Sequence, residues 1–154
     1  MKMIQKMRNA RENKKGFTLT EMIVVLVIIV ILIALLVPTL VGYIDKAKEK
    51  SVMAEGKMVL TAAQTVASER YGESKGLTDA TDAAPGTVTY TNVDNSVTGG
   101  DQGAIAKLAE MPAKGKIVKL EIVEYKVKSI EYSNGGKTAT YTSAGWTVAK
   151  TATP

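Results

Sequence analysis

The sequence predicts an α+β protein in which a long N-terminal helix packs on a C-terminal antiparallel sheet of three or four strands. Residues 17–41 form an apolar run, and residues 42–71 continue it with apolar positions along one helical face. From residue 116 onward, short stretches alternate apolar and polar side chains between glycine-rich turns, as in a half-buried sheet. The amphipathic half of the helix supplies the cover that such a sheet needs.

The apolar run is long enough to cross a membrane as a helix. All sixteen residues from Met22 to Val37 are apolar, and Glu21 is the one charged residue between Phe17 and Val41. At about 1.5 Å per residue, residues 17–41 span roughly 37 Å, against a bilayer core of about 30 Å. Valine and isoleucine favour strands in water, but in lipid a single segment must satisfy its own backbone groups, which requires a helix.

Pro38 and Gly42 mark the predicted weak point of this helix. Proline lacks a backbone donor and clashes with the preceding turn, so we expect a kink near residues 34–38. The helix then continues as an amphipathic segment to about residue 71, where Gly72 is the expected C-cap.

Residues 72–115 are predicted to be mostly loop, because glycine, proline and asparagine recur through them. Within this region, residues 77–83 have the pattern of a short helical turn, and residues 87–91 alternate as a short strand. Residues 101–111 are predicted to form a short helix.

Residues 116–150 carry the predicted sheet. Ile117–Tyr132 is expected to be extended, with a break or bulge near Glu124–Lys126, and Asn134 begins a hairpin turn. Residues 138–142 and 146–150 form the later strands. The side chains expected to hold the sheet together are Tyr125, Ile130, Tyr132, Tyr141 and Trp146.

Composition excludes several kinds of catalytic and metal site. The chain has no cysteine, which rules out disulfides, zinc–thiolate sites and thiol nucleophiles. It has no histidine either, so Ser-His-Asp and Cys-His mechanisms are excluded and the commonest metal ligand is missing. We therefore expect no enzymatic activity, no cofactor and no metal site.

The excess positive charge is confined to the N-terminus. The formal net charge is +5, and residues 1–16 contain six basic side chains and one acidic one. Residues 17–154 contain fourteen of each. A basic block before an apolar run predicts a cytoplasmic N-terminus. Taken over residues 17–154 as a whole, the balanced charge gives no reason to expect strong binding to nucleic acid or anionic lipid.

Three interpretations of the N-terminal segment compete. A cleaved secretory signal has a shorter apolar region, and no small-residue cleavage site follows this one. An ordinary signal anchor leaves Glu21 unexplained. A carboxylate in a membrane helix costs on the order of 3 kcal/mol, so it needs a partner. In the third interpretation the chain is cut between Gly16 and Phe17, and the new amine pairs with Glu21 of a neighbouring chain.

The third interpretation coincides with a known signal. Lys14-Lys-Gly-Phe-Thr-Leu-Thr-Glu, followed by the apolar run and Pro38, resembles the class III signal of a type IV prepilin. The resemblance implies a leader of residues 1–16, a filament-core helix of residues 17–41 and a globular pilin domain of residues 42–154. It also implies cleavage after Gly16 by prepilin peptidase, N-methylation of Phe17, assembly through Glu21 and Phe17, and a kink at Pro38 and Gly42.

The same resemblance implies partners and a location. The precursor would be a single-pass membrane protein, and an assembly ATPase and a platform protein would polymerise it with copies of itself into a surface pilus. Such pili serve adhesion, twitching motility, aggregation and biofilm formation. The missing cysteines and the sixteen-residue leader fit a pilin of the Gram-positive, clostridial kind. A pseudopilin or competence pilin, and a monomeric membrane-anchored binding domain, are the alternatives.

Other clusters have ordinary structural explanations beside functional ones. Asp79, Asp82, Asp94 and Asp101 would suit calcium, but we expect solvated loop and cap residues. The lysines at 114, 116, 119, 126 and 128 alternate with Glu121 and Glu124, which predicts a mixed outer face. Tyr125, Tyr132, Tyr141 and Trp146 would suit stacking on DNA or sugar, but core packing is the expected role.

Overall fold

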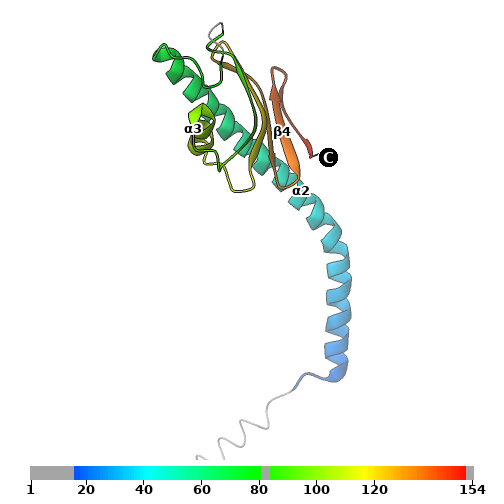
Figure 1. The fold of residues 1–154 in the computed structure, drawn as a ribbon. Coiled ribbons are helices and arrows are strands. Elements are labelled where there is room, and N and C mark those ends of the chain that lie inside the picture. Colours follow the sequence, from blue (N-terminus) through cyan, green and yellow to red (C-terminus); the bar gives the residue numbers. More distant parts are fainter. Residues whose placement is uncertain (1–15, 81–83, 152–154) are drawn as a thin grey trace, which may run out of the picture. The chain divides into compact units, whose positions relative to one another are not determined.

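The computed structural model describes residues 16–80 and 84–151. Its elements are α2 (Leu19–Gly72), β1 (Val88–Asp94), α3 (Gly100–Leu108), β2 (Lys116–Val123), β3 (Lys126–Asn134), β4 (Lys137–Thr142) and β5 (Gly145–Lys150) (Figure 1). The long N-terminal helix and antiparallel sheet confirm the predicted α+β class. The predicted leader before Gly16 and the predicted loop residue Asp82 lie outside the described residues.

The sheet has five strands, where the sequence predicted three or four. All neighbours are antiparallel and follow chain order from β1 to β5. The predicted short strand at residues 87–91 runs on to Asp94 and pairs with β2 along its length. The other added strand comes from the segment Ile117–Tyr132, which is two strands, β2 and β3, joined by a tight turn.

A tight turn joins β2 and β3 at the position where the sequence predicted a break or bulge. Glu124 and Tyr125 have φ of 50° and 60°, the paired positive values of a type I′ turn. That turn normally contains glycine or asparagine, so these two residues give no turn signal. Tertiary contacts hold it instead. Gln64 Nε2 donates to Tyr125 O at 3.0 Å, and Gln64 Oε1 accepts from Val127 N at 3.1 Å.

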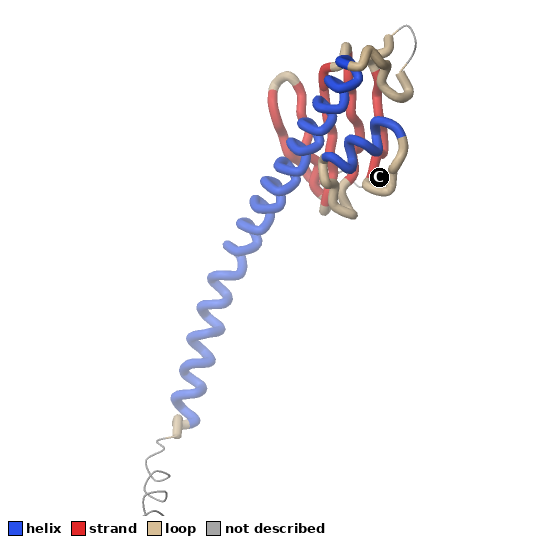
Figure 2. Tube along the Cα trace, turned by 90° about the vertical axis from the view of Figure 1, so that its left-hand side faces the viewer, coloured by secondary structure: helices blue, strands red, loops and turns tan. Residues whose placement is uncertain are grey.

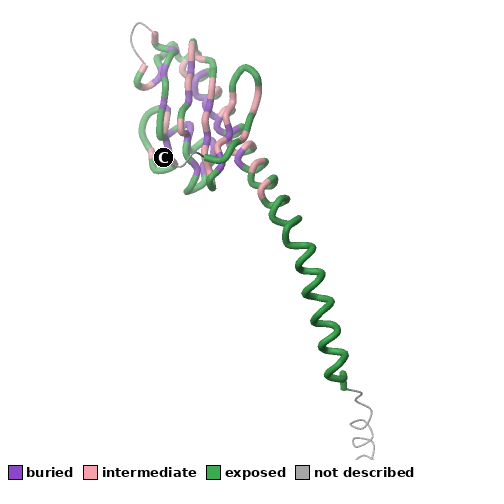
Figure 3. The backbone as a smooth tube through the Cα atoms, turned by 90° about the vertical axis from the view of Figure 1, so that its right-hand side faces the viewer, coloured by how far each residue is buried: buried purple, intermediate pink, exposed green. Residues whose placement is uncertain are grey.

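The core of the globular unit, which begins at Ile44, lies between the sheet and its two helices. The second half of α2 and helix α3 cover the same face of the sheet (Figure 2). Buried residues lie along the strands and in the second half of α2, whereas residues 19–44 of α2 are exposed throughout (Figure 3). The most deeply buried large side chains are Tyr132, Ile105, Ile117, Leu120, Ile122, Ile130, Val59 and Val93.

The predicted aromatic packing is confirmed in the core and along the last two strands. Tyr132 is fully buried, and Tyr125, Tyr141 and Trp146 pack against the core while partly exposed. The rings of Tyr141 and Trp146, which pair across β4 and β5, have centroids 5.3 Å apart. Their burial supports the packing interpretation over a stacking platform.

The C-terminus of α2 is capped two residues later than predicted. Gly72 is still helical, and Ser74 adopts the left-handed conformation with φ of 55°. Ser74 N donates to Tyr71 O at 3.1 Å, and Lys75 N donates to Arg70 O at 2.9 Å. These two bonds form a Schellman motif with serine at the position usually taken by glycine, so the prediction of a Gly72 cap is wrong.

Candidate functional site

The first turn of α2 is closed by a reciprocal pair of residues. Thr18 immediately precedes the helix, and its hydroxyl accepts a bond from Glu21 N at 3.2 Å. Glu21 Oε2 accepts from both the Thr18 amide and the Thr18 hydroxyl, each at 3.0 Å. This is a capping box, in which a threonine N-cap and a glutamate three residues later satisfy free amides at the helix start.

The capping box gives Glu21 a role that the sequence analysis missed. The signal was present as Thr-x-x-Glu before an apolar run, but the sequence analysis predicted only that Glu21 pairs with the amine of a neighbouring chain. Its Oε2 carries every hydrogen bond that the described residues make to the side chain, and Oε1 makes none. Because Glu21 is exposed, Oε1 is accessible to a donor from outside the chain.

The predicted cleavage bond lies outside the helix. Gly16, Phe17 and Thr18 have no helical assignment, and α2 begins at Leu19. Phe17 is 76% exposed, and a Cβ built on Gly16 would meet no atom within 4 Å. Gly16, Phe17, Thr18 and Glu21 together line an open hollow of about 410 Å³. The backbone here is not protected by helical hydrogen bonds, which suits the approach of a peptidase or of a second chain.

The helix that follows presents its apolar side chains outward. Within the described residues, α2 is the one helix long and apolar enough to cross a membrane, and no part of its most apolar window is buried. The large side chains from Leu19 to Val41 are at least 41% exposed. Exposed apolar surface of this extent needs lipid or other helices around it.

Pro38 lies inside an uninterrupted helical assignment that also includes Gly42. Proline cannot donate to the carbonyl of Ala34, so the ladder of backbone bonds lacks one member there. The neighbouring Thr39 hydroxyl donates to Leu36 O at 2.7 Å. No side chain approaches a Cβ built on Gly42 within 4 Å. The kink at Pro38 and Gly42 remains a prediction.

Of the acidic residues considered for calcium, the three within the described residues each accept hydrogen bonds from other groups of the chain. Asp94 accepts bonds from Ser96, and Asp79 Oδ2 accepts from Gln102 Nε2 at 2.9 Å. Asp101 was expected to be a solvated cap, and that expectation is wrong, because it is fully buried and paired with Arg70. Across residues 16–80 and 84–151, no group of acidic side chains is arranged to hold a metal ion.

The lysine cluster on the sheet is mixed with acids as predicted. Lys128 Nζ lies 3.4 Å from Glu121 Oε1, and Ser129 donates to the other carboxylate oxygen at 3.2 Å. These hydrogen bonds, chiefly that of Lys128, lower the pKa of Glu121 below its ordinary value. The outer face is therefore not a uniformly basic surface for nucleic acid.

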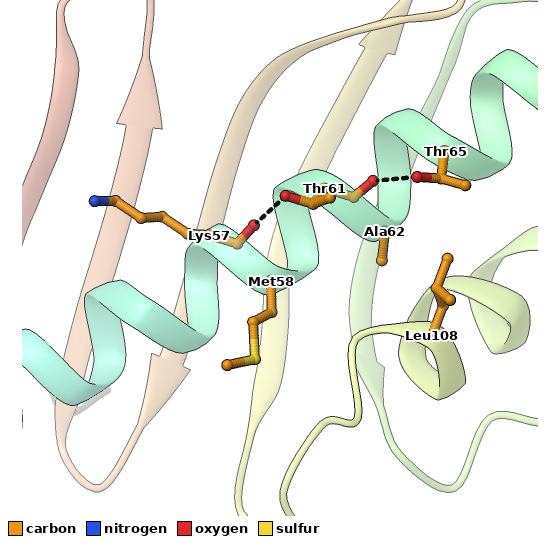
Figure 4. A pocket seen from close by; sticks show the side chains of 6 residues that line it. All are labelled: Lys57, Met58, Thr61, Ala62, Thr65 and Leu108. Carbon is orange, nitrogen blue, oxygen red and sulfur yellow. Dashed lines mark hydrogen bonds between the residues drawn. The ribbon is translucent and has the colours of Figure 1, made fainter.

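The hollow between α2 and α3 has a mostly apolar lining, and one lysine is the only charged residue in that lining. It measures about 430 Å³ and is lined by Lys57, Met58, Thr61, Ala62, Thr65 and Leu108 (Figure 4). The hydroxyls of Thr61 and Thr65 donate to the carbonyls of Lys57 and Thr61 within the same helix, at 3.0 and 2.9 Å. Their bonding capacity is directed to the helix backbone rather than to a ligand.

The fold and the N-terminal site together define a pilin-like arrangement, with an exposed apolar helix preceding an α+β domain. Comparison with family models agrees: residues 11–37 match the prokaryotic N-terminal methylation motif, which is the class III signal of type IV pilins. Searches of curated proteins and of solved structures found no match. The chain thus carries the signal of a structural, pilin-type family rather than of an enzyme family, and its apolar helix fits a membrane-anchored precursor.

Proposed function

We propose that this chain is the structural subunit of a type IV pilus, cut after Gly16 by prepilin peptidase and methylated at Phe17. Residues 17–41 then form the filament core and residues 42–154 the globular domain. The observation that carries the proposal is the combination of the methylation motif with an apolar helix whose side chains are exposed along its length. Once outside lipid, that surface is stabilised only by burial against other helices.

Glu21 supplies the docking contact in this proposal. The new α-amino group of Phe17 is a cation at the end of an apolar helix, and Glu21 is the one carboxylate between residues 17 and 41. Its Oε1 makes no bond within the described residues, so it accepts from the amine of a neighbouring subunit without breaking the capping box. A lone pair of opposite charges in an apolar bundle fixes the register of the helices.

The motif implies a prepilin peptidase, and we extend this to an assembly ATPase, a platform protein and a homopolymeric surface fibre for adhesion, motility or aggregation. A pseudopilin forming a short secretion or DNA-uptake fibre uses the same signal, and a monomeric anchored domain needs no filament. Electron microscopy of cells expressing the tagged chain separates the three. Long surface fibres support the pilus subunit, and short envelope-bound fibres support the pseudopilin. The absence of both kinds of fibre supports the anchored domain.

The capping box determines which variant tests the docking contact. Glu21→Ala removes both the cap and the charge, whereas Glu21→Gln keeps an acceptor for Thr18 and removes only the charge. We expect Glu21→Gln to be cleaved and to stay in the membrane without forming filaments. Glu69→Gln, at an exposed position on the same helix, is the matched control and should assemble normally.

The mass of the mature protein tests processing independently of assembly. We expect an N-terminus at Phe17 carrying one added methyl group, in cells with an active peptidase. An intact Met1 N-terminus in those cells would contradict the proposal at its first step. Normal filaments built from Glu21→Gln would contradict only the docking contact.

A further inference from the structure

Three lysines follow the apolar part of α2 and have no partner in the described residues. Lys46, Lys48 and Lys50 are all exposed, and none forms an ion pair with an acid in residues 16–80 or 84–151. Of the two acids in this segment, Glu49 is engaged, because its Oε1 lies 2.9 Å from Lys137 Nζ. Asp45 remains as the single acid beside three free ammonium groups.

Along the helix, Lys46 lies at the depth of the headgroup layer of a bilayer, and Lys48 and Lys50 lie just beyond that layer. If residues 22–41 fill a hydrocarbon core of about 30 Å, Lys46 and Lys50 follow it by roughly 7 and 14 Å of helix rise. The headgroup layer is about 5–8 Å deep on each side, and flexible lysine stems reach back toward it. Tyr43, exposed just before them, is typical of the membrane interface.

The distribution of the lysines around the helix favours a planar partner. At about 100° per residue, Lys46 and Lys48 point to nearly opposite sides, and Lys50 lies near Lys46. A protein partner docking on one face would contact only part of this set. A layer of lipid headgroups surrounds the helix and contacts all three.

We propose that Lys46, Lys48 and Lys50 bind the anionic phosphates of membrane lipids while the chain is still in the membrane. This inference rests on the membrane-anchored precursor of the proposed function. The ring of lysines fixes the depth of the apolar helix and adds an electrostatic contact that must be released when the helix leaves the bilayer for a filament.

The test uses the full chain in phosphatidylcholine vesicles with and without phosphatidylglycerol. A membrane-impermeant acylating reagent labels exposed amines, and peptide mass spectrometry reads the rate at each lysine. We expect labelling at Lys46, Lys48 and Lys50 to slow about fivefold with phosphatidylglycerol, and this protection to be lost in high salt. Lys119, Lys126 and Lys128, exposed on the sheet, are internal controls whose rates should not change.

A variant pair provides the second measurement. Replacing Lys46, Lys48 and Lys50 by glutamine should lower the number of phosphatidylglycerol molecules retained by the purified chain in native mass spectrometry. The same replacement at Lys119, Lys126 and Lys128 should leave that number unchanged. Equal labelling in both lipids, equal protection of the sheet lysines, or equal retention by both variants overturns the proposal.

Flotation with the vesicles separates this inference from its premise. A chain that fails to float with either lipid refutes the membrane-anchored precursor, and the lysine contact with it. A chain that floats with both lipids but shows no dependence on phosphatidylglycerol refutes the lysine contact alone and leaves the proposed pilus subunit standing.

Discussion

Arg70 and Asp101 join the end of α2 to the first turn of α3. Arg70 Nε and Nη2 lie 2.8 and 2.7 Å from Asp101 Oδ1, and Thr78 N donates to Oδ2 at 2.8 Å. Asp101 is fully buried, whereas the Arg70 side chain is 33% exposed. The hydrogen bond to Asp101 raises the pKa of Arg70 above its ordinary value. One carboxylate thus anchors three chain segments, at residues 70, 78 and 101.

We expect Asp101→Asn to lower the free energy of unfolding by about 2 kcal/mol, because it removes the charge while keeping the size. Urea unfolding followed by the fluorescence of Trp146, the single tryptophan, measures this. Asp79→Asn is the control, since Asp79 is exposed and has a neutral partner, and its change should stay within about 0.5 kcal/mol. Equal effects at both positions would contradict the anchoring role.

Gly56 makes room on α2 for the ring of Trp146. A Cβ at Gly56 would lie 2.8 Å from Trp146 Cζ3 and 3.0 Å from Cη2. We expect Gly56→Ala to lower the unfolding free energy by about 1–2 kcal/mol, because displacing the ring costs more than alanine gains in helix propensity. Gly72→Ala in the same helix meets no atom within 4 Å and should be neutral or stabilising. Stabilisation at both positions would show that the ring moves freely.

The turn between β2 and β3 holds Glu124 in a strained backbone conformation, although its side chain is exposed. Glu124 has φ of 50° and is exposed, so Glu124→Gly should raise the unfolding free energy by about 0.5–1 kcal/mol. Tyr125→Gly relieves similar strain but loses the ring that covers Gly86 and contacts Tyr71 at a centroid distance of 5.4 Å. We expect that variant to be less stable, and thermal unfolding ranks the two.

The hydrogen bonds of Asp94 make part of the stability pH-dependent. The hydroxyl and amide of Ser96 lower the pKa of Asp94, so the folded state binds its proton less readily than the unfolded state. The stability that these hydrogen bonds contribute is present above about pH 4, and it is lost as the pH falls through the lower pKa of Asp94 in the folded state. Ser96→Ala should therefore destabilise at pH 7 more than at pH 3 in urea titrations.

Ser143→Ala is the control for that pH dependence. Ser143 is exposed and its hydroxyl bonds to no described residue, so its effect should be the same at both pH values. A Ser96→Ala effect that stays constant from pH 7 to pH 3 would contradict the assigned cause of the Asp94 shift.

The sequence predicted the elements whose signals are local. The apolar run and the helical spacing of apolar residues after it predicted α2. The alternation of apolar and polar residues after residue 116 predicted the sheet. The motif at residues 14–21 predicted the class III signal, and the family comparison confirms it by matching the N-terminal methylation motif. The capping box at Thr18 and Glu21 also has a local signal, Thr-x-x-Glu, but the charge of Glu21 alone does not indicate its hydrogen-bonding role.

Tertiary structure decided what local signals do not encode. The type I′ turn at Glu124 and Tyr125 forms because Gln64, 61 residues before Tyr125, binds the Tyr125 carbonyl and the Val127 amide. Asp101 is buried because Arg70 and Thr78 reach it from other segments. In each case a strained or charged group is stabilised by partners distant in sequence, and no propensity or period within a short window carries that information. The apolar helix differs from these two cases, because its length and composition alone determine that lipid or other helices must surround it.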